Sequence, residues 1–323
     1  MLQNFQGISI ANSIPDNTNV ALYKEGDILI SNIRPYLKKV WQADRNGGCS
    51  ADVFVLKANN SICSDCFLHY LIANDTFINF VMSGAKGVKM PRGDKKQMVT
   101  YNIGIPPVKE QNKIVSLLSL LDNRIETQNK IIEDLKKLKV AIRDNQLNII
   151  RKQYGLNLQI SELLDYEQPS KYIVSNTEYL DDDNLIPVLT ANKAFILGYT
   201  DETFGIYDKG QCIILDDFTL DCKLVDFAFK VKSSAIKILT SKNGISLRYI
   251  YEYINYIGLE TAEHKRHYIS EIEPMLIAYP GDNNIVNSFC DLMEIYDKKI
   301  EIENKYLQSL LSQKAYLLSN MFI

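Results

Sequence analysis

The sequence predicts an α+β protein in which two mixed α/β domains alternate with two long helices, and the whole chain is built as an internal repeat. The first observation is a pair of long helical patterns, at about residues 109–150 and 282–322. When the second pattern is shifted back by 175 positions, eight of the 27 residues from 121 to 147 meet an identical partner. The second observation is that the segments before the two helices also match, in the same order along the chain.

The boundaries between the predicted segments come from residues that begin or end helices. Pro106 and Pro107 close the first domain, and Glu110 suits the first turn of the helix that follows. Gly155 breaks that helix, and Pro280 precedes the start of the last one. The four predicted segments are a first domain at 1–107, a helix at 108–152, a second domain at 153–279 and a helix at 280–323.

Short apolar runs predict the elements inside each domain. In the first domain, residues 28–30 and 53–56 read as buried strands and residues 67–82 as one helix. In the second domain, strands are expected near 211–215, 227–231 and 235–239. The strand at 23–30 resembles residues 207–214, and the helix start at 67–72 resembles residues 249–254. We therefore expect the two domains to share one topology.

The long helices are expected to pair with each other as an antiparallel coiled coil, related by a pseudo-twofold axis. A helix of about 40 residues spans roughly 60 Å and needs a partner to cover its apolar stripe. Polar residues interrupt the two stripes at matching positions, Gln128 and Lys139 against Glu303 and Lys314, and are candidates for setting the register. The alternative is that each helix packs on its own domain. The predicted pairing residues are Ile125, Ile132, Leu135, Ile142, Ile300, Leu307, Leu310 and Leu317.

Composition excludes several classes of protein. Hydrophobic residues make up 46% of the chain and charged residues 23%, which is typical of a folded protein. No window approaches 18 uninterrupted apolar residues, and the first residues do not form a secretory signal, so we expect a cytoplasmic location with reduced cysteines. The formal net charge of −3 argues mildly against a protein that grips nucleic acid by bulk charge alone.

Motifs for catalysis and for metal binding are weak. The sequence has no Gly-x-x-x-x-Gly-Lys-Ser/Thr loop, no Gly-x-Ser-x-Gly elbow and no His-Glu-x-x-His pair, so we expect no enzyme. Cys63, Cys66 and His69 have the local spacing of a metal site, but a zinc centre would need a fourth ligand such as Cys49. Because no second Cys-x-x-Cys exists and Cys66 and His69 are expected on a packed helix, we predict no metal.

Four segments carry a resemblance to a known family, and with the plan of alternating domains and helices the resemblance extends over nearly the whole chain. The phrases GDILISNIRPYL at 26–37 and IPPVKEQ at 105–111, with YEQPSKY at 166–172 and FILGYT at 195–200, resemble the DNA-specificity subunit of type I restriction–modification systems. Family members normally have several dozen more residues before the position of Gly26. We therefore expect a first domain that is shortened at its N-terminal side.

The resemblance implies a non-catalytic, sequence-reading subunit. Each domain would be a target-recognition domain for one half of a split DNA sequence, and the helices would act as a ruler for the gap between the halves. The helices would also dock methyltransferase subunits and a motor-nuclease subunit. The cofactors S-adenosylmethionine, ATP and magnesium are expected on those partners and none in this chain. The alternatives are an assembly protein that does not bind DNA, and an inactive shortened variant.

Candidate DNA contacts are basic residues on loops and beside strands, because Lys and Arg pair with phosphates and Arg also reads guanine edges. For every one of them the alternative is a solvated surface charge. Asp216 and Asp217 are expected to orient such basic side chains or to accept a hydrogen bond from cytosine. The candidates are Arg34, Lys38, Lys39, Lys86, Lys89 and Arg92 in the first domain, and Lys171, Lys193, Lys223, His264, Lys265, Arg266 and His267 in the second.

Overall fold

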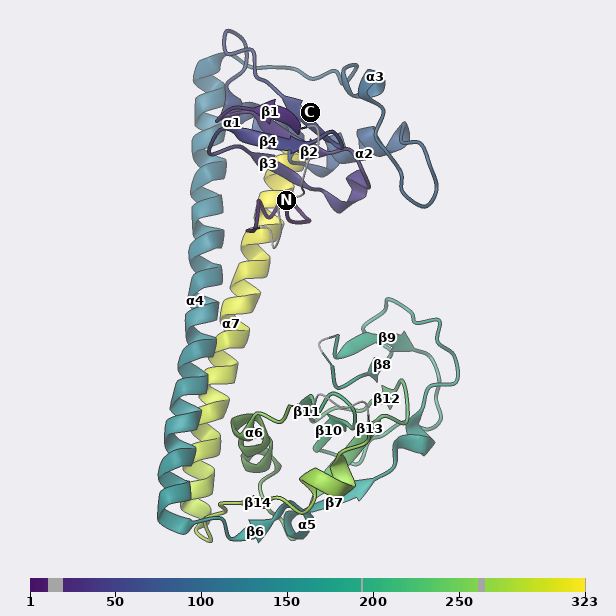
Figure 1. Ribbon diagram of the computed structural model, residues 1–323, viewed down its shortest axis with the longest axis vertical. Helices are drawn as coiled ribbons and strands as arrows, with labels where there is room; N and C mark the ends of the chain where they lie inside the picture. Colours follow the sequence, from purple (N-terminus) through teal and green to yellow (C-terminus); the bar gives the residue numbers. More distant parts are fainter. Residues whose placement is uncertain (11–19, 193, 261–264, 323) are drawn as a thin grey trace. The chain divides into compact units, whose positions relative to one another are not determined.

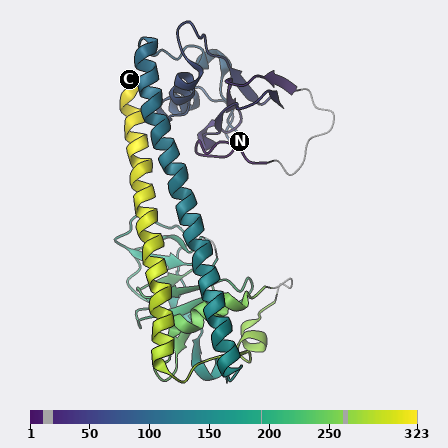
Figure 2. The same cartoon turned by 90° about the vertical axis from the view of Figure 1, so that its left-hand side faces the viewer.

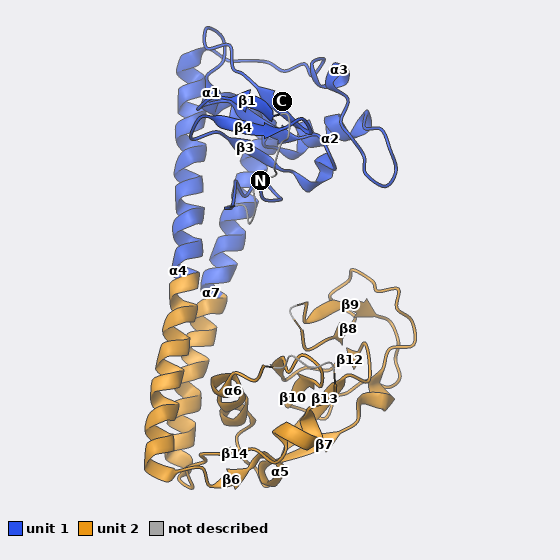
Figure 3. Cartoon of the chain, in the orientation of Figure 1, with its two compact units in different colours: residues 1–132, 302–323 blue, residues 133–301 orange. Residues whose placement is uncertain are grey.

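The computed structural model describes residues 1–10, 20–192, 194–260 and 265–322, and it divides into two compact units (Figure 3). Unit 1 comprises residues 1–132 and 302–323, and unit 2 comprises residues 133–301. Two long helices, α4 (Val108–Tyr154) and α7 (Asn283–Met321), each contribute one part to unit 1 and the other part to unit 2 (Figure 1). Each unit is therefore an α/β domain completed by segments of both long helices.

Unit 1 is built around a three-stranded antiparallel sheet of order β3-β2-β5. A separate two-stranded ribbon pairs β1 with β4. The helix predicted at 67–82 is two helices, because Asn74 interrupts it: its side chain accepts a hydrogen bond from the Phe77 N–H and donates one to the Leu71 carbonyl. The elements are β1 (Val20–Tyr23), β2 (Ile28–Ser31), η1 (Pro35–Leu37), β3 (Val40–Gln42), β4 (Gly47–Ser50), β5 (Val53–Leu56), α1 (Asp65–Ile72), α2 (Asp75–Ser83) and α3 (Lys95–Met98).

The core of unit 1 lies between its sheet, its short helices and the two long helices. Ile28 and Phe67 are almost completely buried there. Leu118 of α4, together with Leu318 of α7 and Phe322 just beyond its end, belongs to the same apolar cluster. Burying each such side chain contributes about 1.5–3 kcal/mol of free energy, which stabilises the packing of the long-helix segments against the domain.

Unit 2 contains a four-stranded antiparallel sheet of order β11-β10-β13-β7, a three-stranded sheet of order β12-β8-β9 and a ribbon of β14 with β6. Only Lys230–Val231 of the strand predicted at 227–231 is extended. The elements are β6 (Leu158–Gln159), α5 (Ile160–Leu163), β7 (Leu164–Glu167), η2 (Pro169–Tyr172), β8 (Ile186–Leu189), β9 (Ile196–Thr200), β10 (Cys212–Asp216), β11 (Cys222–Val225), β12 (Lys230–Val231), β13 (Ile236–Ser241), α6 (Leu247–Ile257), η3 (Tyr268–Ile272) and β14 (Leu276–Ile277).

The two units repeat one strand arrangement. In unit 1, Leu29 of the central strand β2 faces Trp41 on β3 and Val55 on β5. In unit 2, Ile213 of the central strand β10 faces Leu224 on β11 and Leu239 on β13. A helix follows each sheet, α1 in unit 1 and α6 in unit 2. The repeat in the sequence is therefore also a repeat in strand order, and the register between β2 and β5 is the same as that between β10 and β13.

Within each unit the segments of α4 and α7 lie side by side and run antiparallel (Figures 1 and 2). In unit 1, Asp122 of α4 pairs with Lys314 of α7, and Gln128 further along α4 contacts Glu303 earlier on α7. In unit 2, Lys139 pairs with Asp297. The eight predicted pairing residues are all buried or half-buried, with Leu310 only 4% exposed. Among the described residues, no helix has the length and apolar content needed to cross a membrane.

Candidate nucleic-acid interface

A basic hairpin, residues 86–92, projects from unit 1 between α2 and α3. Reciprocal backbone hydrogen bonds of 2.9 Å between Lys86 and Arg92 close it. Gly87 has a φ of +98°, which a residue with a side chain rarely adopts, so glycine makes the turn possible. Lys89 is exposed at the tip, between the fully exposed Val88 and the half-exposed Met90. The hairpin therefore offers cations and backbone N–H groups to a partner.

The hairpin is anchored to the segment that follows β2. The Arg34 N–H donates to the Pro91 carbonyl at 2.7 Å, and the Gly93 N–H donates to the Asn32 carbonyl at 3.1 Å. Arg34 itself adopts a left-handed backbone, with φ 51°. These contacts bring Arg34, which the sequence places about 50 residues earlier, to the hairpin. The backbone of Arg34 therefore lies next to the hairpin that carries Lys86 and Arg92.

Two carboxylates hold the cations of the hairpin. The Lys86 ammonium lies 2.9 Å from Asp94, and the Arg92 guanidinium lies 3.3 Å from Asp52. Hydrogen bonding to Lys86 lowers the pKa of the Asp94 carboxyl, and the same contact raises the pKa of Lys86. All four side chains are partly or largely exposed, and ion pairs of this kind contribute at most about 1 kcal/mol. Breaking them to bind another anion would therefore cost little free energy.

The other two candidates in unit 1, Lys38 and Lys39, lie between η1 and β3. Lys38 forms a 2.7 Å ion pair with Asp75 of α2, and its ammonium lies 6.0 Å from the centre of the Phe5 ring. Lys39 is half-buried, and its carbonyl accepts a hydrogen bond from the Ser31 N–H. Lys38 is therefore engaged within the domain and does not join the basic hairpin.

In unit 2, Lys265 and Arg266 are exposed, and each contacts one neighbouring side chain. The Lys265 ammonium lies 3.0 Å from Glu271, and the Arg266 guanidinium lies 6.0 Å from the centre of the Phe218 ring. Phe218 belongs to the turn between β10 and β11. Both cations keep the exposure that a DNA contact requires.

The expectation that His267 contacts DNA is corrected by its burial. The residue is only 2% exposed, and its Nδ1 lies 2.8 Å from Glu271. Its backbone N–H donates to Asp217, as does that of Tyr268. Hydrogen bonds from His267 and then Lys265 lower the pKa of Glu271. His267 therefore fixes the loop that presents Lys265 and Arg266.

The remaining candidates of unit 2 lie on separate elements. Lys171 is exposed on η2, and Lys223 is half-buried on β11. Lys193 and His264 lie outside the described residues.

Two buried lysines that stabilise unit 2 could not be predicted from the sequence. Lys237 is 1% exposed, lies 3.4 Å from Asp217 and stacks over Tyr166. Lys230 is fully buried and pairs with Glu202 at 2.6 Å. No local pattern distinguishes them from surface lysines; only their positions on buried strands do.

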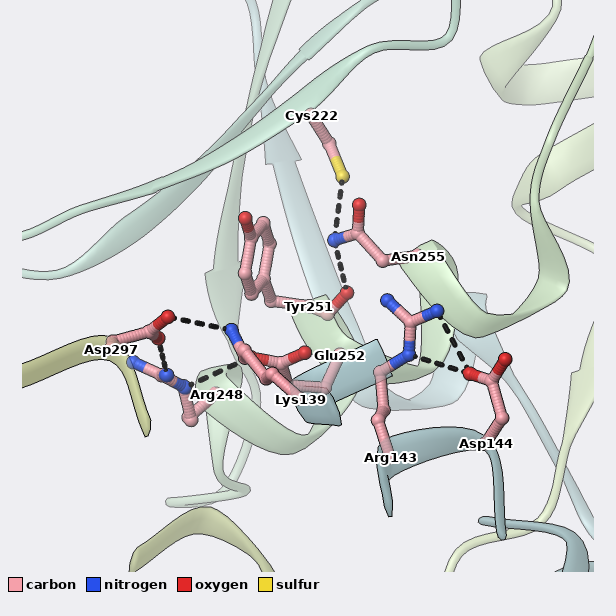
Figure 4. Close-up of polar contacts among 9 residues, drawn as sticks. All are labelled: Lys139, Arg143, Asp144, Cys222, Arg248, Tyr251, Glu252, Asn255 and Asp297. Atoms are coloured by element: carbon pink, nitrogen blue, oxygen red, sulfur yellow. Dashed lines mark hydrogen bonds and ion pairs between the residues drawn. The ribbon is translucent and has the colours of Figure 1, made fainter. Parts of the chain in front are cut away.

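A second set of residues that sequence reasoning missed lies where α6 meets the long helices in unit 2. Lys139 of α4 forms ion pairs with Glu252 of α6 at 3.0 Å and with Asp297 of α7 at 2.8 Å (Figure 4). Arg248 of α6 also pairs with Asp297 and lies 3.4 Å from Glu252, whose side chain is 1% exposed. This cluster ties three helices together.

Unit 1 contains the repeat-related version of this cluster. Lys314 pairs with Asp122 at 2.5 Å, and these residues correspond to Lys139 and Asp297 at the offset of 175. The Tyr70 hydroxyl donates to Asp122 at 2.8 Å, and Tyr70 occupies on α1 the place that Glu252 occupies on α6. The long helices are therefore joined to each domain in the same manner.

The described residues contain no group of three or more His, Cys, Asp or Glu side chains that could hold a metal ion. His69, the histidine of the Cys63-x-x-Cys66 segment, lies on α1 beside Lys314. Burial and then the nearby Lys314 ammonium lower the pKa of His69 to about 4, so the imidazole is neutral at physiological pH.

Comparison with known proteins shows a likeness to type I specificity subunits. Residues 2–137 match the family model of the type I restriction modification DNA specificity domain. This match indicates a DNA specificity domain of this kind in the first part of the chain. In type I restriction–modification systems, this family supplies the DNA specificity and is non-catalytic.

Curated relatives of the specificity family match part of the chain. The EcoR124I/EcoR124II specificity subunit of Escherichia coli is 46% identical over 150 residues, which are 44% of this chain and 37% of that subunit. The MjaVIII specificity subunit of Methanocaldococcus jannaschii is 37% identical over 95 residues, which are 29% of this chain and 22% of that subunit. The chain therefore spans little more than a third of the length of the first relative.

Solved structures show the likeness in fold. A chain from a study of complex assembly and conformational transition of the type I restriction–modification system superposes with a TM-score of 0.61 at 16% identity, covering 98% of this chain and 88% of that chain. The specificity subunit from M. genitalium superposes with a TM-score of 0.59 at 14% identity, covering 100% and 88%. The mixed helix and strand architecture is thus that of specificity subunits.

Proposed function

We propose that this chain is the DNA-specificity subunit of a type I restriction–modification complex and reads a target made of two separated half-sites. The observation that carries the proposal is the repeated unit: one strand order, one following helix and one cluster of charged and polar side chains between the helices occur twice. The DNA-specificity match of residues 2–137 supports a reading role for unit 1, and the repeat extends that role to unit 2.

In this proposal, residues 1–107 and 153–279 are the two target-recognition domains, and 108–152 and 280–323 are spacer helices. The spacer helices pair as an antiparallel coiled coil with pseudo-twofold symmetry and set the gap between the half-sites. Because the two domains differ in sequence, the half-sites differ too. The proposed DNA contacts are the predicted basic residues that keep an exposed or partly exposed side chain: Arg34, Lys38, Lys39, Lys86, Lys89, Arg92, Lys171, Lys223, Lys265 and Arg266.

Methyltransferase subunits are the proposed partners of the long helices. Exposed apolar side chains recur at repeat-related positions: Leu120 corresponds to Ile295, and Ile131 corresponds to Tyr306. Such patches are typical of protein interfaces, and their duplication suits two copies of one partner. A motor-nuclease subunit completes the complex. S-adenosylmethionine, ATP and magnesium reside on these partners, and the complex works in the cytoplasm.

The chain alone is expected to bind DNA weakly, because its formal net charge is −3. Closure of the methyltransferase subunits around the duplex would supply further cationic contacts.

The test is selection from a random DNA pool by the chain bound to its methyltransferase, followed by sequencing and gel shifts. The expected output is two conserved blocks at a constant separation. The double variant Lys89→Ala/Arg92→Ala should alter only one block, whereas Lys152→Ala on an exposed helix end serves as the matched control. Equal recovery of all sequences would favour a scaffold without DNA recognition or an inactive variant.

A further inference from the structure

The two units differ at one edge of the shared sheet. In unit 2, β7 pairs with the outer edge of β13, so that Tyr166 faces Leu239 and Leu164 faces Ser241. The strand of unit 1 that corresponds to β13 is β5, where Val55 occupies the place of Leu239. Among the described residues, no strand pairs with the outer edge of β5. Unit 1 therefore shows an open edge where unit 2 has a closed one.

The segment that closes unit 2 does more than pair with β13. Leu158–Glu167 includes β6, which pairs with β14, and α5, whose first N–H donates to the Met275 carbonyl at 3.0 Å. Ile160, Leu163 and Leu164 are each at most 1% exposed. They lie in one apolar cluster with Leu239 of β13 and with the face of α6 that carries Ile250, Tyr253 and Ile254. We call Leu158–Glu167 the closing segment.

Unit 1 has an open apolar groove over the corresponding elements. The groove has a volume of about 800 Å³ and is lined by β5, by the α1 residues Leu68, Leu71 and Ile72, and by Ile103 and Ile105 just before α4. The α1 residues correspond to Ile250, Tyr253 and Ile254 of α6. The residues before α4 correspond in chain order to β14. The strand β13, the helix α6 and the strand β14, which contact the closing segment in unit 2, thus have their counterparts along this groove.

Apolar exposure and charge indicate what the groove accepts. Ile62 is 53% exposed and Ile105 is 41% exposed at the groove, which is a high exposure for isoleucine. Lys57 and Lys95 also line it. The closing segment of unit 2 is matched to such a surface: it has three buried apolar side chains, three acidic residues and no basic residue.

We propose that the groove of unit 1 is a docking site for a separate polypeptide segment of the same kind. Its chemistry is one apolar helical turn followed by an antiparallel strand with acidic side chains, about ten residues in all. The strand adds to the outer edge of β5 through main-chain hydrogen bonds, and the apolar turn fills the space beside α1. A second copy of this chain is a poor source, because its own closing segment is buried in its own unit.

The test places such a segment next to the groove. Residues 157–168 of this chain are joined to the N-terminus of the full chain through a flexible Gly/Ser linker. A short linker gives an effective concentration near 1 mM, so a segment with a Kd near 0.1 mM is bound about 90% of the time. Amide hydrogen exchange in β5 should then slow about tenfold. The control is the same fusion with Leu163→Asp and Leu164→Asp in the added segment only.

A second variant separates docking from a general change in stability. Ile62→Asp in the groove should abolish the added protection, whereas Ile196→Asp, an exposed position in unit 2, should leave it intact. Unchanged exchange in β5 for the fusion that folds normally would overturn the proposal. Concentration-dependent dimerisation of the unfused chain, with loss of protection at 158–167, would also overturn it, because the occupant would then be a second copy.

Discussion

Replacing the repeat-related lysines Lys139 and Lys314 is expected to destabilise the two units to different extents. Each is replaced by methionine, which keeps the length and apolar stem of the side chain and removes the charge. Lys139 neutralises Glu252, whose side chain is 1% exposed. Lys314 neutralises Asp122, whose side chain is 35% exposed and which also accepts a hydrogen bond from Tyr70.

The two losses are expected to differ in size. Leaving one member of a buried ion pair without its partner costs about 3–5 kcal/mol. Arg248 lies 3.4 Å from Glu252 and compensates part of the charge, so about 2 kcal/mol is expected for Lys139→Met. The pair of Lys314 and Asp122 is more exposed to solvent, so about 0.5 kcal/mol is expected for Lys314→Met.

The measurement is native-state hydrogen exchange at several urea concentrations, because it reports the opening free energy of each unit separately. Lys139→Met should lower the free energy of opening in α6 of unit 2 and leave unit 1 unchanged. Lys137→Met, at an exposed ion pair on the same helix, is the matched control. Adding Glu252→Gln to Lys139→Met should restore most of the loss. The reasoning is refuted if Lys139→Met costs no more than Lys137→Met, or if Glu252→Gln gives no recovery.

Three further outcomes are expected. Replacing Lys265 and Arg266 by Ala should weaken binding of the assembled complex to one half-site by about 1–3 kcal/mol if one of them contacts a base, and unchanged affinity in a gel shift would count against this loop. Inserting four residues, about one helical turn, into both α4 and α7 should lengthen the gap in the methylated sequence and leave both half-sites unchanged; altered half-sites in methylome sequencing would contradict the ruler role. Because burial and Lys314 depress the pKa of His69 to about 4, below its unfolded value near 6.5, its contribution to stability is complete above pH 6.5 and is lost as pH falls toward 4. In His69→Gln, the free energy of unfolding measured with urea should therefore fall by about 2 kcal/mol less than in the wild type between pH 6.5 and pH 4. If the free energies of both proteins fall in parallel with pH, His69 is not the titrating group.

The repeat and the long helices were predictable because they follow from regular patterns. The apolar runs at Ile28–Ile30 and Val53–Leu56 form buried strands, and apolar residues at spacings of three and four line the paired faces of α4 and α7. The break between α1 and α2 was not predicted, because it depends on the side chain of Asn74 capping a helix within an otherwise continuous apolar pattern.

The surface chemistry was less predictable, because charge alone does not reveal exposure. Lys230 and Lys237 are buried because particular carboxylates, Glu202 and Asp217, reach them from distant segments. His267 is buried for the same reason, since Glu271 and Asp217 bind its ring and backbone. The meeting of Arg34 with the basic hairpin depends on a backbone contact to Pro91 across more than 50 residues. Such pairings are set by the tertiary fold and leave no local signal.

The contact between Gln128 and Glu303 makes the two halves of the chain non-interchangeable. These residues correspond to each other in the repeat, and the Gln128 amide donates to the Glu303 carboxylate at 2.6 Å while Gln128 is 4% exposed. Two copies of the first helix paired in this register would set amide against amide, and two copies of the second would bring carboxylates together and repel. Only the mixed pair joins a donor to a charged acceptor, so this position selects the heterologous match within one chain over self-association of either half.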